Sequence, residues 1–148
     1  MTTIAYKDGI LAADTQLTYS GGVSGTSRKL ELLSDGRVVA IAGDVTQEYW
    51  FKQVLQGVKI PKKKYKFKGI QAIIIDGTKV YQCWDGPELI DVGDSYLAIG
   101  HGHSIARAGM AIGMTAKQAV KMAGEVNIYT NTIVDTYDAD KKKFTYGK

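Results

Sequence analysis

Asp-Gly pairs between short apolar runs constrain the fold of this chain more than any other feature. They occur at Asp8-Gly9, Asp35-Gly36 and Asp76-Gly77. Asp and Gly accept the positive φ angles of tight turns, so each pair predicts a hairpin of two antiparallel strands. The expected hairpins join residues 3–6 to 10–13, residues 29–33 to 38–42, and residues 71–75 to 79–84. Antiparallel pairing must therefore organise most of the sheet structure.

Helical patterns lie between and after these hairpins. The first predicted helix covers residues 45–56 and is followed by Gly57, a common stop signal. Thr115 and Gln118 form a capping-box pattern that opens a later helix over residues 116–123. The other expected elements are a helix capped by Ser104 and strands at 96–100, 126–134 and 144–146. Strands in blocks separated by helices predict an α+β layered domain.

The composition fits one globular domain that covers residues 1–148. Apolar residues make up 45% of the chain and charged residues 23%, close to the average of folded proteins. The chain has no apolar run long enough to span a bilayer, and its first residues lack the pattern of a secretory signal. Cys83 is the only cysteine, so no internal disulfide is expected. These features predict a cytoplasmic protein without membrane contact.

Lysines between residues 59 and 68 supply much of the net charge of +4. From Lys64 to Lys68 charged and aromatic residues alternate strictly, which predicts a strand with one solvated face. Lysines on such a strand would protect a sheet edge from unwanted pairing. A platform for single-stranded nucleic acid is the alternative, since aromatic rings stand between the lysines. The edge strand is the favoured interpretation, and nucleic acid is not an expected partner.

The hairpins bring polar groups together at their open ends. In the first, a three-residue turn would set Thr2 opposite Asp14, whereas a two-residue turn would set Thr3 there with Thr2 alongside. In the second, an Asp35-Gly36 turn would set Lys29 opposite Ala42, beside Gly43. Either register places the start of the chain near a carboxylate. Spacing alone leaves open an ordinary ion pair between Asp14 and Lys29.

The ordered set of motifs resembles the β-type subunits of proteasomes, and most of all the HslV peptidases. The motifs are Thr2-Thr3-Ile4-Ala5, Gly9-Ile10-Leu11-Ala12-Ala13-Asp14, Arg28-Lys29-Leu30, Ile41-Ala42-Gly43, Tyr96-Leu97-Ala98-Ile99-Gly100 and Ala123-Gly124-Glu125-Val126-Asn127-Ile128-Tyr129-Thr130-Asn131. Their order and approximate spacing hold over nearly the whole chain. The resemblance implies the N-terminal nucleophile (Ntn) hydrolase fold, a four-layer αββα sandwich of two antiparallel sheets.

The resemblance also implies a threonine endopeptidase. Removal of Met1 would expose the α-amine of Thr2, which can accept the proton of its own hydroxyl. Lys29 would lower the pKa of that amine by like-charge repulsion, and Asp14 would hold Lys29 charged and in place. Gly43 matches the family glycine whose N–H stabilises the oxyanion. The family has serine where His101 stands, so a neutral His101 would either assist proton movement or serve structure alone.

A cation site follows from the same resemblance. HslV-like chains bind sodium through backbone carbonyls after the last major helix, and the matching positions are Gly124, Asn127 and Thr130. A glycine that simply ends a helix before a strand explains the same residues equally well. No cofactor is expected to be required for peptide hydrolysis.

Assembly is expected because the chain has room for one central helix where the family has two. Without the second helix, Trp50, Phe51 and Val54 would lose their cover, so another subunit is expected to bury them. The resemblance implies a homo-oligomeric ring, a hexamer or a pair of stacked hexamers, that cleaves unfolded polypeptide delivered by a separate AAA+ unfoldase. The alternative is a catalytically silent Ntn-fold protein that assembles or binds a partner.

Overall fold

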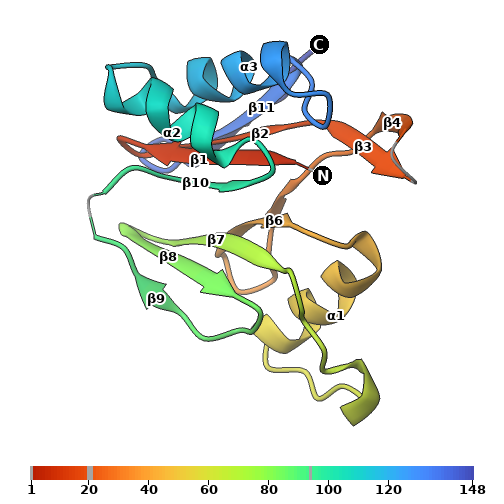
Figure 1. The fold of residues 1–148 in the computed structure, drawn as a ribbon. Helices are drawn as coiled ribbons and strands as arrows, with labels where there is room; N and C mark the ends of the chain where they lie inside the picture. Colours follow the sequence, from red (N-terminus) through yellow and green to blue (C-terminus); the bar gives the residue numbers. More distant parts are fainter. Residues whose placement is uncertain (1, 20–21, 94) are drawn as a thin grey trace.

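Two five-stranded antiparallel sheets stack face to face at the centre of the molecule (Figure 1). The computed structural model describes residues 2–19, 22–93 and 95–148. Met1, whose removal is predicted above, lies outside the described residues. The first sheet has the order β10-β1-β2-β11-β12. Its strands are β1 (Thr3–Lys7), β2 (Ile10–Asp14), β10 (Leu97–Gly100), β11 (Val134–Asp138) and β12 (Lys143–Thr145).

The second sheet has the order β5-β6-β7-β8-β9, and a small β3–β4 ribbon projects from the end of β2 (Figure 1). The strands of the second sheet are β5 (Leu30–Leu32), β6 (Val38–Ala42), β7 (Gln71–Asp76), β8 (Lys79–Trp84) and β9 (Ile90–Asp91). The ribbon consists of β3 (Gln16–Tyr19) and β4 (Gly22–Thr26). The ribbon and β9 were not predicted.

Helices cover the outer face of each sheet (Figure 1). Helices α2 (His103–Ala111) and α3 (Ala116–Val126) pack on the first sheet, whereas α1 (Val45–Leu55) packs on the second. A single 3-10 turn, η1 (Lys62–Lys64), follows α1. The predicted α+β sandwich of helix, sheet, sheet and helix layers is therefore confirmed, with one α-helix in the layer beside the second sheet.

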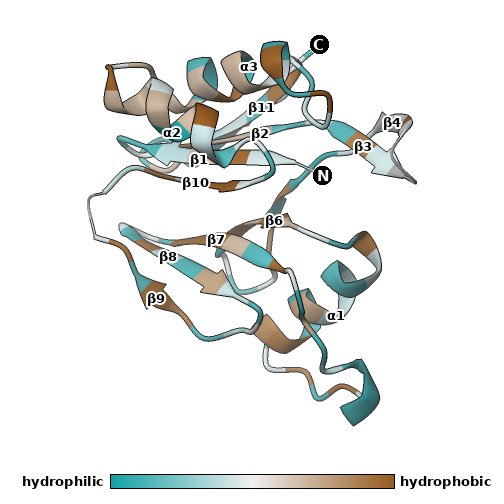
Figure 2. Ribbon diagram, viewed as in Figure 1, coloured by the Kyte–Doolittle hydropathy of each residue, from teal (hydrophilic) through white to brown (hydrophobic). Residues whose placement is uncertain are grey.

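Three apolar clusters hold the four layers together. Successive strand residues point to opposite faces, so Ile73 joins the cluster between the sheets while Ile74 faces α1 and Phe51. Small residues on the outer face of the first sheet, Ala5 and Ala12, allow α2 and α3 to approach closely. Figure 2 shows apolar residues along the strands of both sheets.

The first hairpin has the shorter of the two predicted turns. Lys7 pairs with Ile10, and Asp8 and Gly9 both have positive φ, as a two-residue turn requires. Ile4 pairs with Ala13, so the strand ends bring the N-terminus beside the end of β2. The third hairpin is also confirmed, with Asp76 paired to Lys79.

The register predicted for the second hairpin is wrong by one residue. Leu32 pairs with Val38, and Leu33 N–H donates to Arg37 O at 2.7 Å. The turn therefore contains three residues and ends at Gly36, whose φ is +91°. An Asp-Gly pair also fits this longer turn, because its glycine can take the left-handed position.

One predicted strand is absent, another begins later than expected, and one helix is longer than expected. Residues 64–68 form no strand: Lys64 ends η1, residues 65–68 follow as a loop, and Phe67 is buried against α1. Residues 126–133 form the end of α3 and a turn, so the strand begins only at Val134. Gly124 lies inside α3, whose capping box at Thr115 and Gln118 is confirmed. No described helix has the length and apolar character needed to cross a membrane.

Candidate active site

Thr2 is buried at the entrance to β1, with 4% of its surface exposed. Its Oγ1 donates a hydrogen bond to Asp14 Oδ1 at 2.6 Å. Its carbonyl oxygen accepts from the backbone N–H of His101 at 2.6 Å. The side chain and the main chain of Thr2 are thus both fixed by the first sheet.

Asp14 lies at the end of β2 and is fully buried. Its Oδ1 accepts from the backbone N–H of Thr3 at 2.9 Å, and its Oδ2 accepts from that of Gln16 at 3.1 Å. A buried carboxylate is costly unless its oxygens are hydrogen-bonded. These backbone donors therefore hold the carboxylate in one orientation beneath Thr2.

Lys29 reaches the same point from the segment just before β5. Its Nζ donates to Asp14 Oδ1 at 2.8 Å and also contacts Thr2 Oγ1. Burial lowers the pKa of Lys29, and the nearby Asp14 carboxylate offsets part of that effect. The Thr2 hydroxyl consequently lies between a carboxylate and an ammonium group. This arrangement can orient the hydroxyl and favour its deprotonated form.

Gly43 directly follows β6, at the wall of the cleft beside Thr2. Its φ is +144°, and a Cβ there would meet Ile70 Cδ1 at 2.8 Å and Gly69 O at 3.0 Å. Glycine is therefore required by both backbone conformation and space. The predicted oxyanion residue and the predicted nucleophile border the same cavity.

Gly100, at the end of β10, is a site residue that the sequence analysis did not identify. A Cβ at this position would meet Thr2 O at only 2.1 Å. Its N–H donates to Gln71 Oε1 at 3.0 Å, which connects β10 of the first sheet to β7 of the second. The sequence signal was a glycine after an apolar strand, which spacing alone does not connect to Thr2.

His101 contacts Thr2 through its backbone and not through its ring. The imidazole is exposed and packs edge-on against Tyr129, with ring centroids 4.5 Å apart. His103 Nδ1 lies 2.9 Å from Gly100 O. Both histidines line the cleft, and a role of His101 in proton movement stays a prediction.

A cleft of about 830 Å³ opens in front of Thr2. Residues from both sheets and from the first turns of α1 line it. Glu48 on α1 is one of the acidic lining groups, and burial raises its pKa. The other charged lining side chains among the described residues are Asp44, Lys29 and Lys68.

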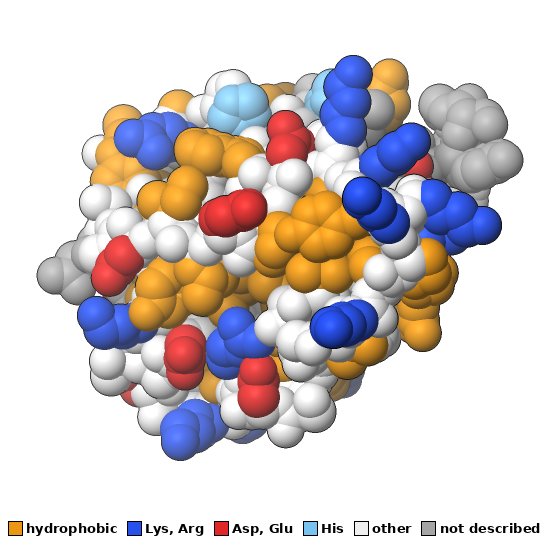
Figure 3. Space-filling model, turned by 90° about the horizontal axis from the view of Figure 1, so that it is seen from below, with side chains coloured by type: hydrophobic (Ala, Val, Ile, Leu, Met, Phe, Trp, Pro, Cys, Tyr) orange, Lys and Arg blue, Asp and Glu red, His pale blue; other side chains and the backbone are white. Residues whose placement is uncertain are grey.

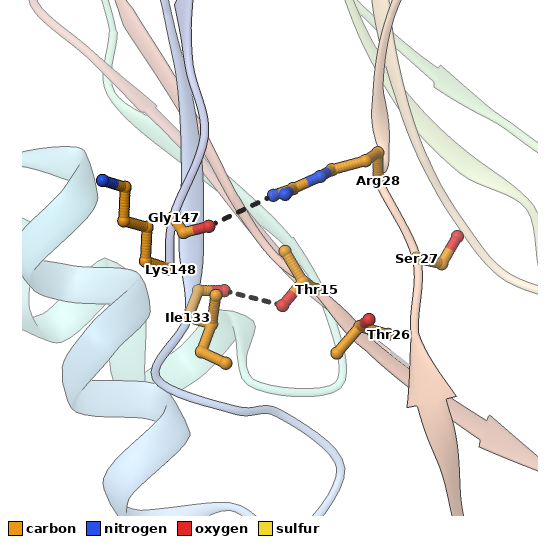
Figure 4. Close-up of a pocket in the computed structure, with 7 residues that line it drawn as sticks. All are labelled: Thr15, Thr26, Ser27, Arg28, Ile133, Gly147 and Lys148. Atoms are coloured by element: carbon orange, nitrogen blue, oxygen red, sulfur yellow. Dashed lines mark hydrogen bonds between the residues drawn. The ribbon is translucent and has the colours of Figure 1, made fainter.

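A separate cavity of about 310 Å³ lies near the C-terminus (Figure 4). Figure 4 shows Arg28 extending toward Gly147 at this cavity, with Thr15 between Ile133 and Thr26. Arg28 Nη1 pairs with Asp135 Oδ1 at 2.5 Å. None of the predicted catalytic residues lines this cavity, whereas Thr2, Lys29 and Gly43 line the larger cleft.

The predicted sodium ligands Gly124, Asn127 and Thr130 lie around the end of α3 and the turn that follows. Carbonyl oxygens are suitable ligands for a hard cation. Asn127 O already accepts from Thr130 N–H at 3.2 Å, so ligation would use its remaining lone pair. Thr130 Oγ1 lies 2.7 Å from Thr3 Oγ1, which connects this turn to β1. Sodium binding stays a prediction.

Comparison with solved structures identifies the fold. Eukaryotic HslV from Trypanosoma brucei matches with a TM-score of 0.71 at 16% identity, over 91% of this chain and 96% of that one. The fold is that of HslV. A structure described as Thiobacillus denitrificans BPH matches with a TM-score of 0.70 at 15% identity, over 99% of this chain and 98% of that one. No family model and no curated protein matches the sequence.

Proposed function

We propose that the chain is a threonine endopeptidase of the HslV and proteasome β class, with Thr2 as its nucleophile once Met1 is removed. The observation that carries this proposal is the position of the Thr2 hydroxyl, held between Asp14 and Lys29 at the wall of an 830 Å³ cleft. The HslV-like fold supports a hydrolase, and the resemblance of the motifs supports peptide bonds as its substrate.

The proposed reaction begins with proton transfer inside one residue. The free α-amine of Thr2, with an ordinary pKa of about 7.7–8.0, accepts the proton of Thr2 Oγ1. Oγ1 then attacks the peptide carbonyl carbon, and the N–H of Gly43 stabilises the oxyanion. The protonated amine returns its proton to the leaving nitrogen, which releases one product and leaves an ester on Thr2. Water hydrolyses that ester and regenerates the free hydroxyl.

Lys29 and Asp14 act on this reaction through charge and position. The Lys29 ammonium favours the unprotonated amine because a nearby positive charge repels the protonated form. It favours the deprotonated hydroxyl because the same charge stabilises the negative oxygen. Asp14 keeps Lys29 charged within a buried site.

We further propose that the chain assembles into a homo-oligomeric ring and that an AAA+ unfoldase feeds it with unfolded polypeptide. The HslV-like fold supports the ring.

Covalent labelling tests the proposed nucleophile. We expect intact-mass measurement to give a protein that begins at Thr2, and an electrophilic peptide such as an epoxyketone to modify Thr2 alone. Thr2→Ala should abolish labelling and peptide cleavage, and Thr2→Ser should retain both. Thr18→Ala is the matched control, since Thr18 is another threonine at the cleft.

Retained Met1 with no labelling would contradict the peptidase proposal. It would favour the silent Ntn-fold protein that assembles or binds a partner. Circular dichroism of Thr2→Ala is needed beside the labelling, since Thr2 is buried and its loss must not be confused with unfolding.

A further inference from the structure

Six lysines form an exposed basic surface next to the cleft. They stand within residues 59–68, here called the lysine segment: Lys59, Lys62, Lys63, Lys64, Lys66 and Lys68. The proposed chemistry uses none of them. The segment follows α1 in the lower part of Figure 1, and Figure 3 shows Lys and Arg side chains gathered along one side of the molecule's underside.

The lysine segment concentrates the positive charge of the molecule. The net charge is 19 − 15 = +4, so without these six lysines the chain would carry 4 − 6 = −2. Within the described part of the chain, none of the six forms an ion pair with a carboxylate. The lysines are also not required at a sheet edge, because residues 64–68 form no strand. Their charge is therefore available to a partner.

Buried anchors hold this segment in place. Phe67 is buried and packs edge-on against Phe51 of α1, with centroids 5.4 Å apart. Gly69 N–H donates to Asp85 Oδ1 at 2.6 Å, and Ile70 is fully buried. The lysines thus project from a backbone that is fixed on the second sheet and α1.

The end of the lysine segment lines the same cleft as the proposed nucleophile. Lys68 and Gly69 line the cleft, and Gln71 of β7 is bonded to Gly100 beside Thr2. From Lys64 to Lys68 the chain can span at most about 14 Å. An extended polypeptide bound at Thr2 would therefore reach these lysines with residues a few positions from the cleaved bond.

We propose that the lysine segment binds acidic stretches of the polypeptide substrate, so that chains with several Asp or Glu residues near the cleaved bond are preferred. This inference rests on the proposed peptidase function. A polypeptide fits better than single-stranded nucleic acid, which binds by base stacking on free rings. The exposed ring of Tyr65 packs against Phe67, and Lys64 Nζ lies 5.6 Å from the centre of the Trp50 ring.

A matched pair of triple variants tests this surface. Lys62→Gln/Lys63→Gln/Lys64→Gln removes three adjacent charges from the lysine segment. Lys141→Gln/Lys142→Gln/Lys143→Gln removes three from the turn before β12 and the first residue of that strand. Both sets are exposed and change the net charge equally. Binding of a fluorescent glutamate-rich peptide is measured by anisotropy in the Thr2→Ala background, with a glutamine-rich peptide as reference.

The first triple variant should bind the glutamate-rich peptide about tenfold more weakly, and the second should bind it as the parent does. Added salt should weaken parental binding, because it screens exposed charges. Equal binding by the two triple variants would overturn the proposal. So would an oligo-dT strand that binds more tightly than the peptide through the same lysines.

Failure of this inference is distinct from failure of the proposed function. Peptide binding in the Thr2→Ala protein does not need catalysis. Selective loss of binding in the first triple variant, without covalent labelling at Thr2 of the parent, would support the acidic-peptide surface and contradict the peptidase. Labelling at Thr2 together with equal peptide binding by both triple variants would support the proposed peptidase and contradict the acidic-peptide surface.

Discussion

Thr2 lies beside Asp14 because the two-residue turn at Asp8-Gly9 sets the register between β1 and β2. This turn is a local feature of the sequence, so the contact could be predicted from it. Lys29 and Gly43 were assigned through the family resemblance, because spacing cannot align one hairpin with another. Gly100 and Gln71 were missed for the same reason: their contacts join the two sheets, and nothing in the local sequence shows how the sheets are docked.

The Asp14–Lys29 pair also differs in burial from an exposed ion pair. Asp14 is fully buried and only 11% of the Lys29 side chain is exposed. Removal of one partner from a buried pair leaves an uncompensated charge, which typically costs about 3–5 kcal/mol. Loss of Lys29 therefore affects stability as well as activity, and the two effects must be measured separately.

Lys29→Met should lower the free energy of unfolding by about 3–5 kcal/mol. It should also lower the cleavage rate per folded molecule by about 10²-fold or more, because the Thr2 amine loses the nearby charge that adjusts its pKa. Chemical denaturation gives the stability, and active-site-normalised kinetics give the rate. Lys52→Met is the control: it breaks a more exposed pair with Glu31 and should cost about 0–1 kcal/mol. An unchanged rate per folded molecule would make Lys29 structural only.

Secondary-structure elements were predictable where turn and cap residues act locally. The first and third hairpins, α1 and the capping box of α3 all follow from a few adjacent residues. The strand expected at residues 64–68 failed because alternation also arises when one aromatic ring, Phe67, anchors a loop to a helix. The β3–β4 ribbon was missed because all of β4 is exposed and its sequence has no apolar alternation.

Gly124 was interpreted from the sequence as a residue that ends a helix, but the structure shows that close packing requires glycine there. It lies within α3, and a Cβ there would meet Asn131 O at 2.2 Å and Asn131 C at 2.5 Å. These are backbone atoms of the segment that bonds Thr15, so they cannot move aside without disturbing the loop. Glycine is kept because the loop crosses the helix closely, and not because the helix ends.

Gly124→Ala should destabilise the protein by about 1–3 kcal/mol through this overlap, although alanine favours helices. Gly109→Ala in α2 is the matched control. Its new Cβ would meet the flexible ends of Met122 and Met114, so its effect should be smaller. Urea denaturation of both variants gives the comparison. A Gly124→Ala protein as stable as the parent would show that glycine is not required for this packing.

At the scale of the whole molecule, the layered sandwich is confirmed, but the apolar patch that was expected to require another subunit is covered within the chain. Antiparallel layers were predictable from the order of the elements, whereas the stacking of two sheets was supplied by the resemblance. Exposure of Trp50, Phe51 and Val54 after loss of a second central helix was expected to require another subunit. That expectation is wrong: Phe51 is buried, and Trp50 and Val54 are partly buried in the cluster that includes Phe67 and Ile60. Loop residues replace the missing helix as cover.

Assembly remains a consequence of the proposed function, since a peptidase with an open site would attack folded neighbours. Light scattering at micromolar concentration should give a closed homo-oligomer, with six subunits in a ring or twelve in two stacked rings as the family-based expectation. Thr2→Ala should assemble equally, because its side chain faces its own chain. A monodisperse species of 16.1 kDa would contradict the ring and the caged peptidase.

The placement of Thr2 also sets an order of events during synthesis. Thr2 is translated long before its neighbours, since β1 pairs with β10 at residues 97–100 and β2 with β11 at residues 134–138. Its surroundings are complete only when nearly the whole chain has been translated. An aminopeptidase needs an accessible, extended terminus, and the folded chain buries Thr2 and holds its carbonyl. In the proposed peptidase, Met1 would therefore be removed from the nascent chain, before the late strands close around residue 2.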